Sequence, residues 1–446
     1  MKTAGIDIGT TSISDVITEG SDNHLLGSRT VTHNASLHAE KAYHRLQDPE
    51  KLFRLACDAL CDLIRVHGTP QAIGLTGQMH GILYVDAAGQ AVSPLYTWQD
   101  DCGSQPLTNT NGNSSASLLR DAGLPASSGY GLATHLFLQH THSVPANAVS
   151  FVSIADFVAM RLTACTEAFA APDLAASFGG LDVKTGSWMI NALEHSSVDT
   201  SYLPKLHLKH DIIGLTTGCI DGIPEGIPVL CSLGDHQASV FGSTDCPEGS
   251  LLLNIGTGSQ VSMPVNQYID ASSPLEIRPF LSGSYLLTGA ALCGGRAYAM
   301  LEQFYRSITR NETSLYAWME ENAAAFLKEH KKEEAWQIET AFAGKRNDPS
   351  ASGNMCGITT ENFTPGAMTV GMICGILNEL HEMYEKMCTL TGKTAVCLIG
   401  SGNGLRQNRV MQQLTEEIFH LPLQISEAKE EAACGAAKLA GKMLQS

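Results

Sequence analysis

Two short turns rich in glycine and hydroxyl side chains are the first candidates for chemistry in this sequence. Residues 9–12 read Gly-Thr-Thr-Ser after an apolar segment that contains Asp7, and residues 256–259 read Gly-Thr-Gly-Ser after Asn254. Glycine lets backbone N–H groups approach phosphate oxygens without a Cβ clash, and the hydroxyl groups add donors. The two turns together indicate a polyphosphate site, and Asp7 suits Mg²⁺, which prefers oxygen ligands.

The surroundings of the two turns match as well. "AGIDIGTTSIS" (4–14) and "LLLNIGTGSQVSM" (251–263) each predict an apolar strand, a turn and a second strand. A Walker P-loop needs a helix after the glycines and a Gly-Lys-Ser or Gly-Lys-Thr sequence, and the first turn has neither. Two ordinary β-hairpins are the alternative interpretation. A pattern that recurs after about half of the chain favours two related halves.

Asp235 stands where "GDHQAS" (234–239) predicts a change from strand to helix. A carboxylate there could accept the proton of an alcohol that attacks phosphorus. Phosphoryl transfer needs little more from a protein than positioning, charge stabilisation and an oriented nucleophile. The alternative is a helix N-cap, which is a common role for aspartate.

Two further segments combine aromatic, amide, imidazole and carboxylate side chains, which together suit a sugar. "TGQMHG" (76–81) lies between two predicted strands, and "YTWQDD" (96–101) follows an apolar stretch. A few polar groups beside an apolar or aromatic surface are typical of small-molecule sites, although each residue alone could serve packing. The polar and aromatic candidates for sugar contacts are Gln78, His80, Trp98, Gln99 and Asp100, and Met79 between the first two is apolar.

Two glycine-rich segments precede predicted helices in the second half of the chain. "GSGNG" (400–404) could lie against an adenine or ribose, with the helix N-terminus near a phosphate. Gly294 and Gly295 also precede a long helical pattern. The histidine pairs His140/His142 and His207/His210 have metal-like spacing without a third ligand nearby, so we assign them to surface or core.

Composition limits the class of protein. The chain has 446 residues, enough for two domains, and its net charge of −17 argues against general nucleic-acid binding. The 13 cysteines are scattered without a Cys-x-x-Cys pair, which argues against a disulfide framework. We expect no signal peptide and no membrane span, and a cytoplasmic protein with reduced thiols.

Eight segments in order resemble the FGGY family of carbohydrate kinases. They are "GIDIGTTSIS", "TGQMHG", "TWQD", "ADFVAMRLT", "LGDHQAS", "NIGTGSQ", "GSGNG" and "EEAACGAA". The resemblance implies an α/β fold of two ribonuclease-H-like domains of the actin/Hsp70/sugar-kinase superfamily around a central cleft. We place the N-terminal domain at residues 1–240, with the sugar pocket, and the C-terminal domain at 241–446, with the adenosine site.

The resemblance also implies an ATP- and Mg²⁺-dependent enzyme that phosphorylates the terminal hydroxyl of a ketose. The segments are most similar to the subgroup that converts sedoheptulose to sedoheptulose 7-phosphate, and xylulose or another pentulose is the alternative substrate. An ATP-gated binding protein of the actin/Hsp70 type is the alternative from a different class. Sugar and ATP are the expected partners, without nucleic acid or membrane, in a monomer or homodimer.

Residue roles carry over from the family by position. Asp235 is expected to be the catalytic base and a sugar contact, and Asp7 to bind the metal. The family resemblance implies a sugar pocket lined by Gln78, Met79, His80, Trp98 and Asp100. Cys102 stands near a position where many relatives have arginine, which leaves one sugar contact open. The expected phosphate-binding residues are Gly9, Thr10, Thr11, Ser12, Gly256, Thr257 and Gly258. The expected adenosine-binding residues are Gly294, Gly295, Gly400, Ser401, Gly402 and Asn403.

Overall fold

The computed structural model describes residues 1–20, 23–108, 110–244, 249–345, 348, 350–426 and 430–445. The chain divides into two compact units. Unit 1 comprises Met1–Asp245, Pro279–Gly283 and Ala428–Ser446, and unit 2 comprises Cys246–Arg278 and Ser284–Glu427. The end of the chain therefore belongs to the same unit as its beginning, and the expected division at residues 240 and 241 stays a prediction.

A mixed sheet forms the centre of unit 1. Its strands run in the order β13-β14-β5-β1-β2-β3, and β15 also pairs with β5. Strand β1 is antiparallel to β2 and parallel to β5, so the β1–β2 hairpin lies beside a crossover strand. The strands are β1 (Lys2–Ile8), β2 (Ser12–Glu19), β3 (His24–Thr32), β5 (Ile73–Gly77), β13 (Ile212–Leu215), β14 (Pro228–Leu230) and β15 (Leu233–Gly234).

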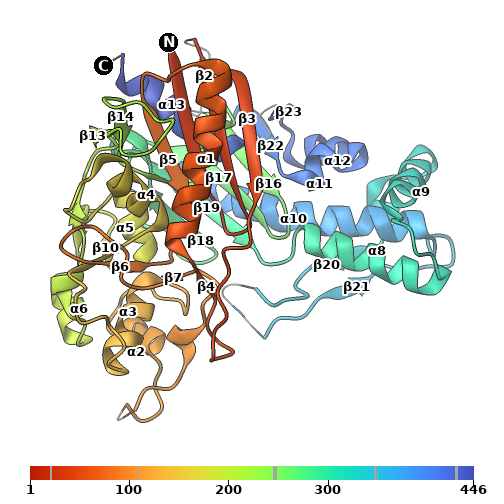
Figure 1. The fold of residues 1–446 in the computed structure, drawn as a ribbon. Helices are drawn as coiled ribbons and strands as arrows, with labels where there is room; N and C mark the ends of the chain where they lie inside the picture. The colour runs from red at the N-terminus through yellow and green to blue at the C-terminus, as the bar shows by residue number, and fades with distance from the viewer. Residues whose placement is uncertain are drawn as a thin grey trace. The chain divides into compact units, whose positions relative to one another are not determined.

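Helices cover both faces of this sheet, which explains why β1 and β2 are buried almost throughout. Helix α1 (Pro49–His67) packs on β2 and β3 (Figure 1), and Asp48 caps its first turn by accepting from Lys51 N at 3.0 Å. Helix α13 (Glu431–Met443) packs on β1, β5 and helix α7 (Asp235–Gly242).

Most of the remaining elements of unit 1 build a second hydrophobic cluster, from residues between Ile82 and Val198, whereas the helix at Ile154–Thr163 packs on the sheet. These elements hold the predicted sugar segments. The helices are α2 (Ser115–Asp121), α3 (Gly131–His140), α4 (Ile154–Thr163), α5 (Pro172–Phe178) and α6 (Ile190–His195), with short 3₁₀ turns at Cys102–Ser104, Thr200–Tyr202 and Leu281–Gly283. The short strands are β4 (Leu46–Gln47), β6 (Leu83–Val85), β7 (Leu95–Tyr96), β8 (Ser150–Val152), β9 (Phe169–Ala170), β10 (Leu181–Asp182), β11 (Ser187–Trp188) and β12 (Lys205–Leu206).

Unit 2 has its own sheet, in the order β18-β19-β17-β16-β22-β23. Strand β16 is antiparallel to β17 and parallel to β22. The strands are β16 (Ser250–Ile255), β17 (Ser259–Val265), β18 (Leu275–Pro279), β19 (Tyr285–Ala291), β22 (Cys397–Ser401) and β23 (Leu423–Ile425), with the separate hairpin β20 (Gln337–Glu339) and β21 (Asn354–Cys356). The helices are α8 (Gly295–Thr309), α9 (Tyr316–Glu329), α10 (Pro365–Thr391), α11 (Asn403–Arg406) and α12 (Arg409–Phe419), with a 3₁₀ turn at Lys332–Glu334.

The two units repeat one strand arrangement. In unit 1 the order β3-β2-β1-β5-β14 has two antiparallel pairings followed by two parallel ones, and in unit 2 the order β19-β17-β16-β22-β23 has the same pairings. The recurrence expected from the two glycine turns is therefore a duplicated sheet.

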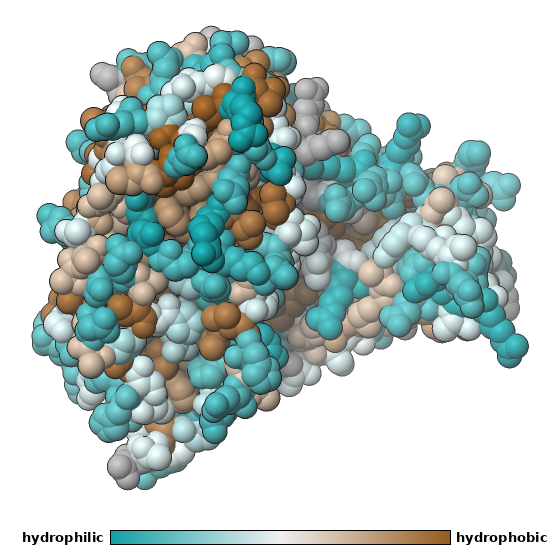
Figure 2. Space-filling view, in the orientation of Figure 1, coloured by the Kyte–Doolittle hydropathy of each residue, from teal (hydrophilic) through white to brown (hydrophobic). Residues whose placement is uncertain are grey.

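One face of the protein carries mainly hydrophilic side chains (Figure 2). Figure 2 shows hydrophilic residues over most of the drawn face, with hydrophobic residues interspersed among them. No helix in the described part of the chain is long and apolar enough to cross a membrane.

Candidate active site

Three neighbouring parallel strands of unit 1 end at one edge of its sheet. Ile8 at the end of β1 pairs with Gly77 at the end of β5, and Gly77 pairs with Gly234 at the end of β15. Gly9, Gln78 and Asp235 therefore follow three adjacent strands. Ligands of α/β proteins bind outside the carboxyl ends of such strands.

Asp7 carries an unpaired carboxylate oxygen near this edge. Its Oδ1 atom is buried and accepts no hydrogen bond from any described residue. Burial, with added repulsion from Asp235 and Glu430, raises the pKa of Asp7 to about 8. An orphaned oxygen among acids is a position that a divalent cation would stabilise, so the residues present fit Mg²⁺. Glu430, which α13 brings here, was not expected from the sequence.

Asp235 is the first residue of α7, and Gly234 occupies the N-cap position. The alternative N-cap role for Asp235 is therefore wrong by one residue. Its side chain is half-buried, and Oδ1 accepts from the His236 backbone N–H at 2.6 Å. A half-buried carboxylate can still reach a bound alcohol, as a general base must.

Thr10 connects the first turn to the sugar segments. Its hydroxyl accepts from Trp98 Nε1 at 2.9 Å and donates to Gln78 Oε1 at 3.4 Å, and its carbonyl accepts from Gln47 Nε2 at 2.8 Å. Gln78 Nε2 in turn donates to Gln47 Oε1 at 2.9 Å. The turn and two predicted sugar contacts are thus one hydrogen-bonded network. The sequence analysis did not predict Gln47 as a site residue. Its position in the sequence shows only that it precedes the helix start at Asp48-Pro49, which does not indicate a role in a binding site.

His80 and Met79 approach the Asp235 turn from β5. His80 has φ of 72°, an uncommon conformation for a residue with a side chain, and its ring stacks on Tyr130 with centroids 4.4 Å apart. A Cβ atom on Gly234 would lie 2.7 Å from the sulfur of Met79, so the two segments touch. Tyr130, the residue before helix α3, is a further aromatic neighbour to which the sequence analysis assigned no role.

Asp100 is buried, and protein groups already use both of its oxygens. Oδ2 accepts from Arg45 N at 2.7 Å and pairs with His44 Nδ1 at 2.9 Å, while Oδ1 accepts from Cys102 N at 3.0 Å. Its contact with a sugar therefore stays a prediction. Cys102 is fully buried and burial raises the pKa of its thiol, so it packs in the core. Trp98, by contrast, is 47% exposed.

His44, Asp100 and Cys102 form the one group of three potential metal ligands found in the described ranges. Their ligand atoms lie within 4.8 Å of one another. The hydrogen bonds of Asp100 account for this arrangement without an ion.

In unit 2, helix α8 begins against the second turn. The N–H groups of Gly295 and Arg296 donate to the carbonyl oxygens of Gly256 and Thr257 at 2.8 and 2.9 Å. A Cβ atom on Gly295 would lie 2.3 Å from Gly256 O, so the contact requires glycine. Gly256 and Thr257, which we expect to bind phosphate, therefore lie beside Gly295, which we expect to bind adenosine.

The predicted adenosine segment lies beside the same turn. Gly400 and Ser401 in β22 pair with Leu253 and Asn254, the residues of β16 just before the turn. Gly402 follows with φ of 83°, and a Cβ atom there would lie 2.5 Å from Ile255 O. Unit 2 therefore brings every predicted residue of the second turn, the α8 start and residues 400–403 to one end of β16.

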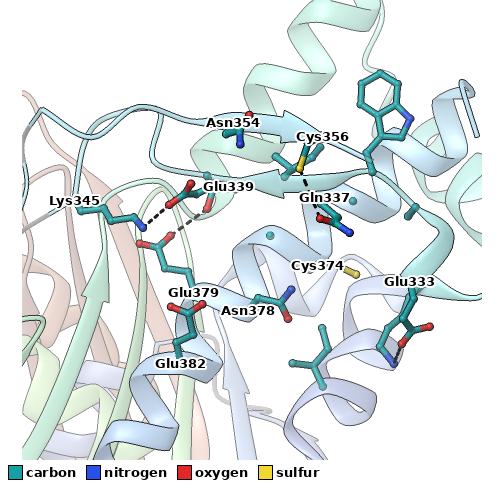
Figure 3. Close-up of a pocket in the computed structure, with 18 residues that line it drawn as sticks. Glu333, Gln337, Glu339, Lys345, Asn354, Cys356, Cys374, Asn378, Glu379 and Glu382 are labelled. Carbon is teal, nitrogen blue, oxygen red and sulfur yellow. Dashed lines mark hydrogen bonds and ion pairs between the residues drawn. The ribbon is translucent and has the colours of Figure 1, made fainter. Parts of the chain in front are cut away.

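One cavity lies beside the first glycine turn, and another lies away from all the predicted site residues. One of about 370 Å³ in unit 1 is lined by both threonines of the first turn, Gln47, Thr97 and Gln99. Another of about 620 Å³ in unit 2 lies between α10 and the β20–β21 hairpin (Figure 3), and none of the predicted site residues lines it.

Two sheets with the same strand order, each with a glycine turn after its first strand, define the mixed α/β fold of the sugar-kinase class. Residues 3–242 match the N-terminal domain of the FGGY family of carbohydrate kinases, and residues 251–444 match its C-terminal domain. The chain belongs to this family and is a sugar kinase, a phosphotransferase.

Individual relatives cover nearly the whole chain. The sedoheptulokinase of Mus musculus is 28% identical, over 98% of this chain and 96% of the relative. The xylulose kinase of Staphylococcus xylosus is 23% identical, over 98% of this chain and 89% of the relative. The crystal structure of gluconate kinase from Lactobacillus acidophilus superposes with a TM-score of 0.84 at 21% identity, covering 100% of this chain and 89% of that chain.

Proposed function

We propose that this protein transfers the γ-phosphoryl group of ATP to the terminal hydroxyl of a ketose, with sedoheptulose as substrate and sedoheptulose 7-phosphate as product. Family membership supports the reaction class, and the sedoheptulokinase name of a relative at 28% identity supports the sugar. The observation that carries the proposal is the shared strand edge of unit 1, where Gly9, Gln78 and Asp235 follow three paired strands.

In the proposed reaction, Asp235 accepts the proton of the sugar hydroxyl. The hydroxyl oxygen then forms a bond to the γ-phosphorus while the bond to the β-phosphate oxygen breaks and ADP leaves. Hydroxyl and backbone N–H groups of residues 9–12 and 256–258 would hold the phosphate oxygens, except for the N–H group of Gly9, which donates to Ser12 O at 3.0 Å. Trp98, His80 and Tyr130 would bind the sugar by its apolar faces and hydroxyls.

Asp7 would hold Mg²⁺ through its unpaired oxygen, beside Glu430. When bound, the ion neutralises charge on the phosphate oxygens. Asp7 would keep its place because it lies at the end of a fully paired strand.

The cytoplasm remains the predicted compartment, and a monomer or homodimer the predicted assembly. In the described part of the chain all twelve cysteines carry free thiols.

A panel of ketoses tests the proposal. ADP release would be measured by a coupled assay with sedoheptulose, xylulose, ribulose and fructose, and the phosphorylated sugar identified by mass spectrometry. We expect the highest kcat/KM with sedoheptulose and phosphate on its terminal carbon.

Each other outcome selects an alternative. A higher kcat/KM for xylulose or ribulose would replace sedoheptulose by a pentulose. ATP hydrolysis that no sugar stimulates, without any phosphorylated sugar, would instead support an ATP-gated binding protein.

A further inference from the structure

Helix α5 contacts both halves of the proposed sugar site. Asp173 and Ser177 lie four residues apart on it, so their side chains share one face. Asp173 Oδ2 accepts from the Gly234 backbone N–H at 2.5 Å. Ser177 Oγ accepts from the His80 backbone N–H at 3.1 Å, and Ser177 O pairs with His80 Nδ1 at 2.8 Å. One helix face therefore holds two segments from distant parts of the chain.

Asp173, at one end of this helix face, is buried, and both of its carboxylate oxygens have hydrogen-bond partners. Asp173 is 1% exposed, and its second oxygen, Oδ1, pairs with His210 Nε2 at 2.9 Å. A hydrogen bond from a backbone amide to a carboxylate is stronger than one between neutral groups. Because Gly234 directly precedes Asp235, this bond fixes the point at which α7 and the proposed base begin.

The Ser177 end holds a residue in a strained conformation. His80 has φ of 72°, and such residues persist where the surroundings hold them in place. Ser177 supplies two of those contacts, one to the backbone and one to the ring. The ring of His80 then stacks on Tyr130.

The helix itself is fixed at both ends. Pro172 occupies its first turn, and Gly179 ends it with φ of 99°. Leu174, Ala175 and Phe178 are fully buried. The distance between Asp173 and Ser177 is therefore set by one helical turn, about 6 Å of rise.

We propose that Asp173 and Ser177 are positioning residues that hold the base Asp235 and the sugar contact His80 at a fixed separation. The inference rests on the proposed function. It predicts an effect on the sugar half of the reaction and none on nucleotide binding. Among the residues that the structure describes, α5 bonds to the Asp235 and His80 segments and to neither glycine turn.

The kinetic test uses Asp173→Ala, Asp173→Asn, Ser177→Ala and the double variant Asp173→Ala with Ser177→Ala. We expect Asp173→Ala to lower kcat about 100-fold, since small misplacements of reacting groups have effects of this size, with the KM for ATP unchanged. Asp173→Asn should recover part of the loss, because its amide oxygen can still accept from Gly234. Ser177→Ala should raise the KM for the ketose.

Matched controls separate positioning from general damage. Asp86→Asn changes a half-buried aspartate that accepts from the backbone N–H groups of Ala88 and Gln90 at 2.9 and 3.0 Å, and Ser196→Ala changes a buried serine that bonds to Ala192 O. Both controls should keep near-normal kinetics. If both α5 alanine variants match these controls, or if their losses lie in the KM for ATP, the inference is wrong.

Hydrogen exchange gives a readout that does not need activity. Peptides containing Gly234 and His80 should exchange faster in Asp173→Ala and Ser177→Ala respectively, and peptides containing residues 9–12 should not change. Unchanged exchange at Gly234 and His80 would overturn the inference, whatever the kinetics show. Wild-type protein without activity on any ketose would overturn the proposed function, and the exchange data would still decide whether α5 holds both segments.

Discussion

Three aspartates of unit 1 sit in different surroundings, and their chemistry follows from these. Asp235 is half-buried at a helix start, Asp7 has one orphaned oxygen among acids, and Asp15 lies wholly inside the sheet. The residue type alone does not distinguish them, because every aspartate that is fully exposed to water has about the same pKa. Burial and neighbouring charges separate their roles.

Asp235→Asn keeps the size of the side chain and removes the base. We expect kcat for ketose phosphorylation to fall by about 10²–10⁴, the usual contribution of a general base, with ATP affinity kept. ADP release and calorimetric ATP binding measure the two effects. Asp121→Asn, at an exposed aspartate at the end of α2, is the control, and turnover of Asp235→Asn within a few-fold of wild type would exclude Asp235 as the base.

The surroundings of Asp15 lead us to expect that the free energy of unfolding depends on pH. Neither of its oxygens has a hydrogen-bond partner in the described ranges. Burial, followed by repulsion from Asp7, raises the pKa of Asp15 well above its usual value, and Arg29 lowers it only in part. The thiol of Cys57 lies nearby and is itself held neutral by burial.

The direction of this pH dependence follows from how many protons the folded and unfolded chains bind. The unfolded chain releases this proton near pH 4, whereas the folded protein keeps it to a much higher pH, so the free energy of unfolding falls as pH rises between these two pKa values. Asp15→Asn cannot titrate. Its stability relative to wild type should rise by about 1.4 kcal/mol per pH unit above pH 4, until the folded carboxyl titrates. Urea unfolding at pH 5, 6 and 7 measures this, and a constant difference would contradict it.

At the scale of elements, α13 shows how small residues set a close packing. A Cβ atom on Gly5 or Gly74 would lie 1.9 or 2.0 Å from a carbonyl oxygen of α13. A Cβ atom on Gly435 would likewise lie 1.9 Å from Ala238 O in α7. The helix thus rests directly on the backbone of β1, β5 and α7, which no larger side chains would allow.

Two glycines of α13 make a matched pair. Gly435→Ala should lower the free energy of unfolding by about 1–3 kcal/mol or more, because its new methyl group meets backbone that cannot move aside. Gly441→Ala should be neutral or stabilising by up to about 1 kcal/mol, since a Cβ atom there has nothing nearer than 3.5 Å and alanine favours helix. Denaturant unfolding measures both, and equal effects would contradict the packing argument.

At the scale of the molecule, the chain returns to unit 1 after it has formed unit 2. A chain that ends after residue 426 would lack α13 and expose the glycine face of β1 and β5. We expect unit 1 of this truncated chain to lose its protection from trypsin while unit 2 keeps most of its own. Mass spectrometry of the fragments assigns each cleavage to a unit, and a chain ending after Met443 is the control. Equal protection of unit 1 in both chains would show that α13 is dispensable.

The fold does not decide the sugar. Gluconate kinase of Lactobacillus acidophilus shares this fold at 21% identity, although its name gives a different substrate. Specificity rests on sites placed on a shared fold. In the proposed function those sites are the segments around Trp98, His80 and Tyr130.

Several features were predictable because they depend on neighbours in the sequence. The glycine turns at 9–12 and 256–258 lie between strands as expected, and Ser153 caps α4. The recurrence of the two turns favoured two related halves, and the two sheets have matching strand orders. Local spacing is sufficient for these because turns, caps and strand alternation involve residues a few positions apart.

The sequence by itself thus determined the family, the two hairpin turns and the candidate residues. Tertiary structure alone decided which of those residues meet. It brought Glu430 to Asp7 across most of the chain, made Gln78 and Asp100 buried hydrogen-bond partners of other protein groups, and placed α5 between Gly234 and His80. The physical reason is that burial and hydrogen-bond partners depend on which distant segments pack together, and no local pattern of residue types encodes that.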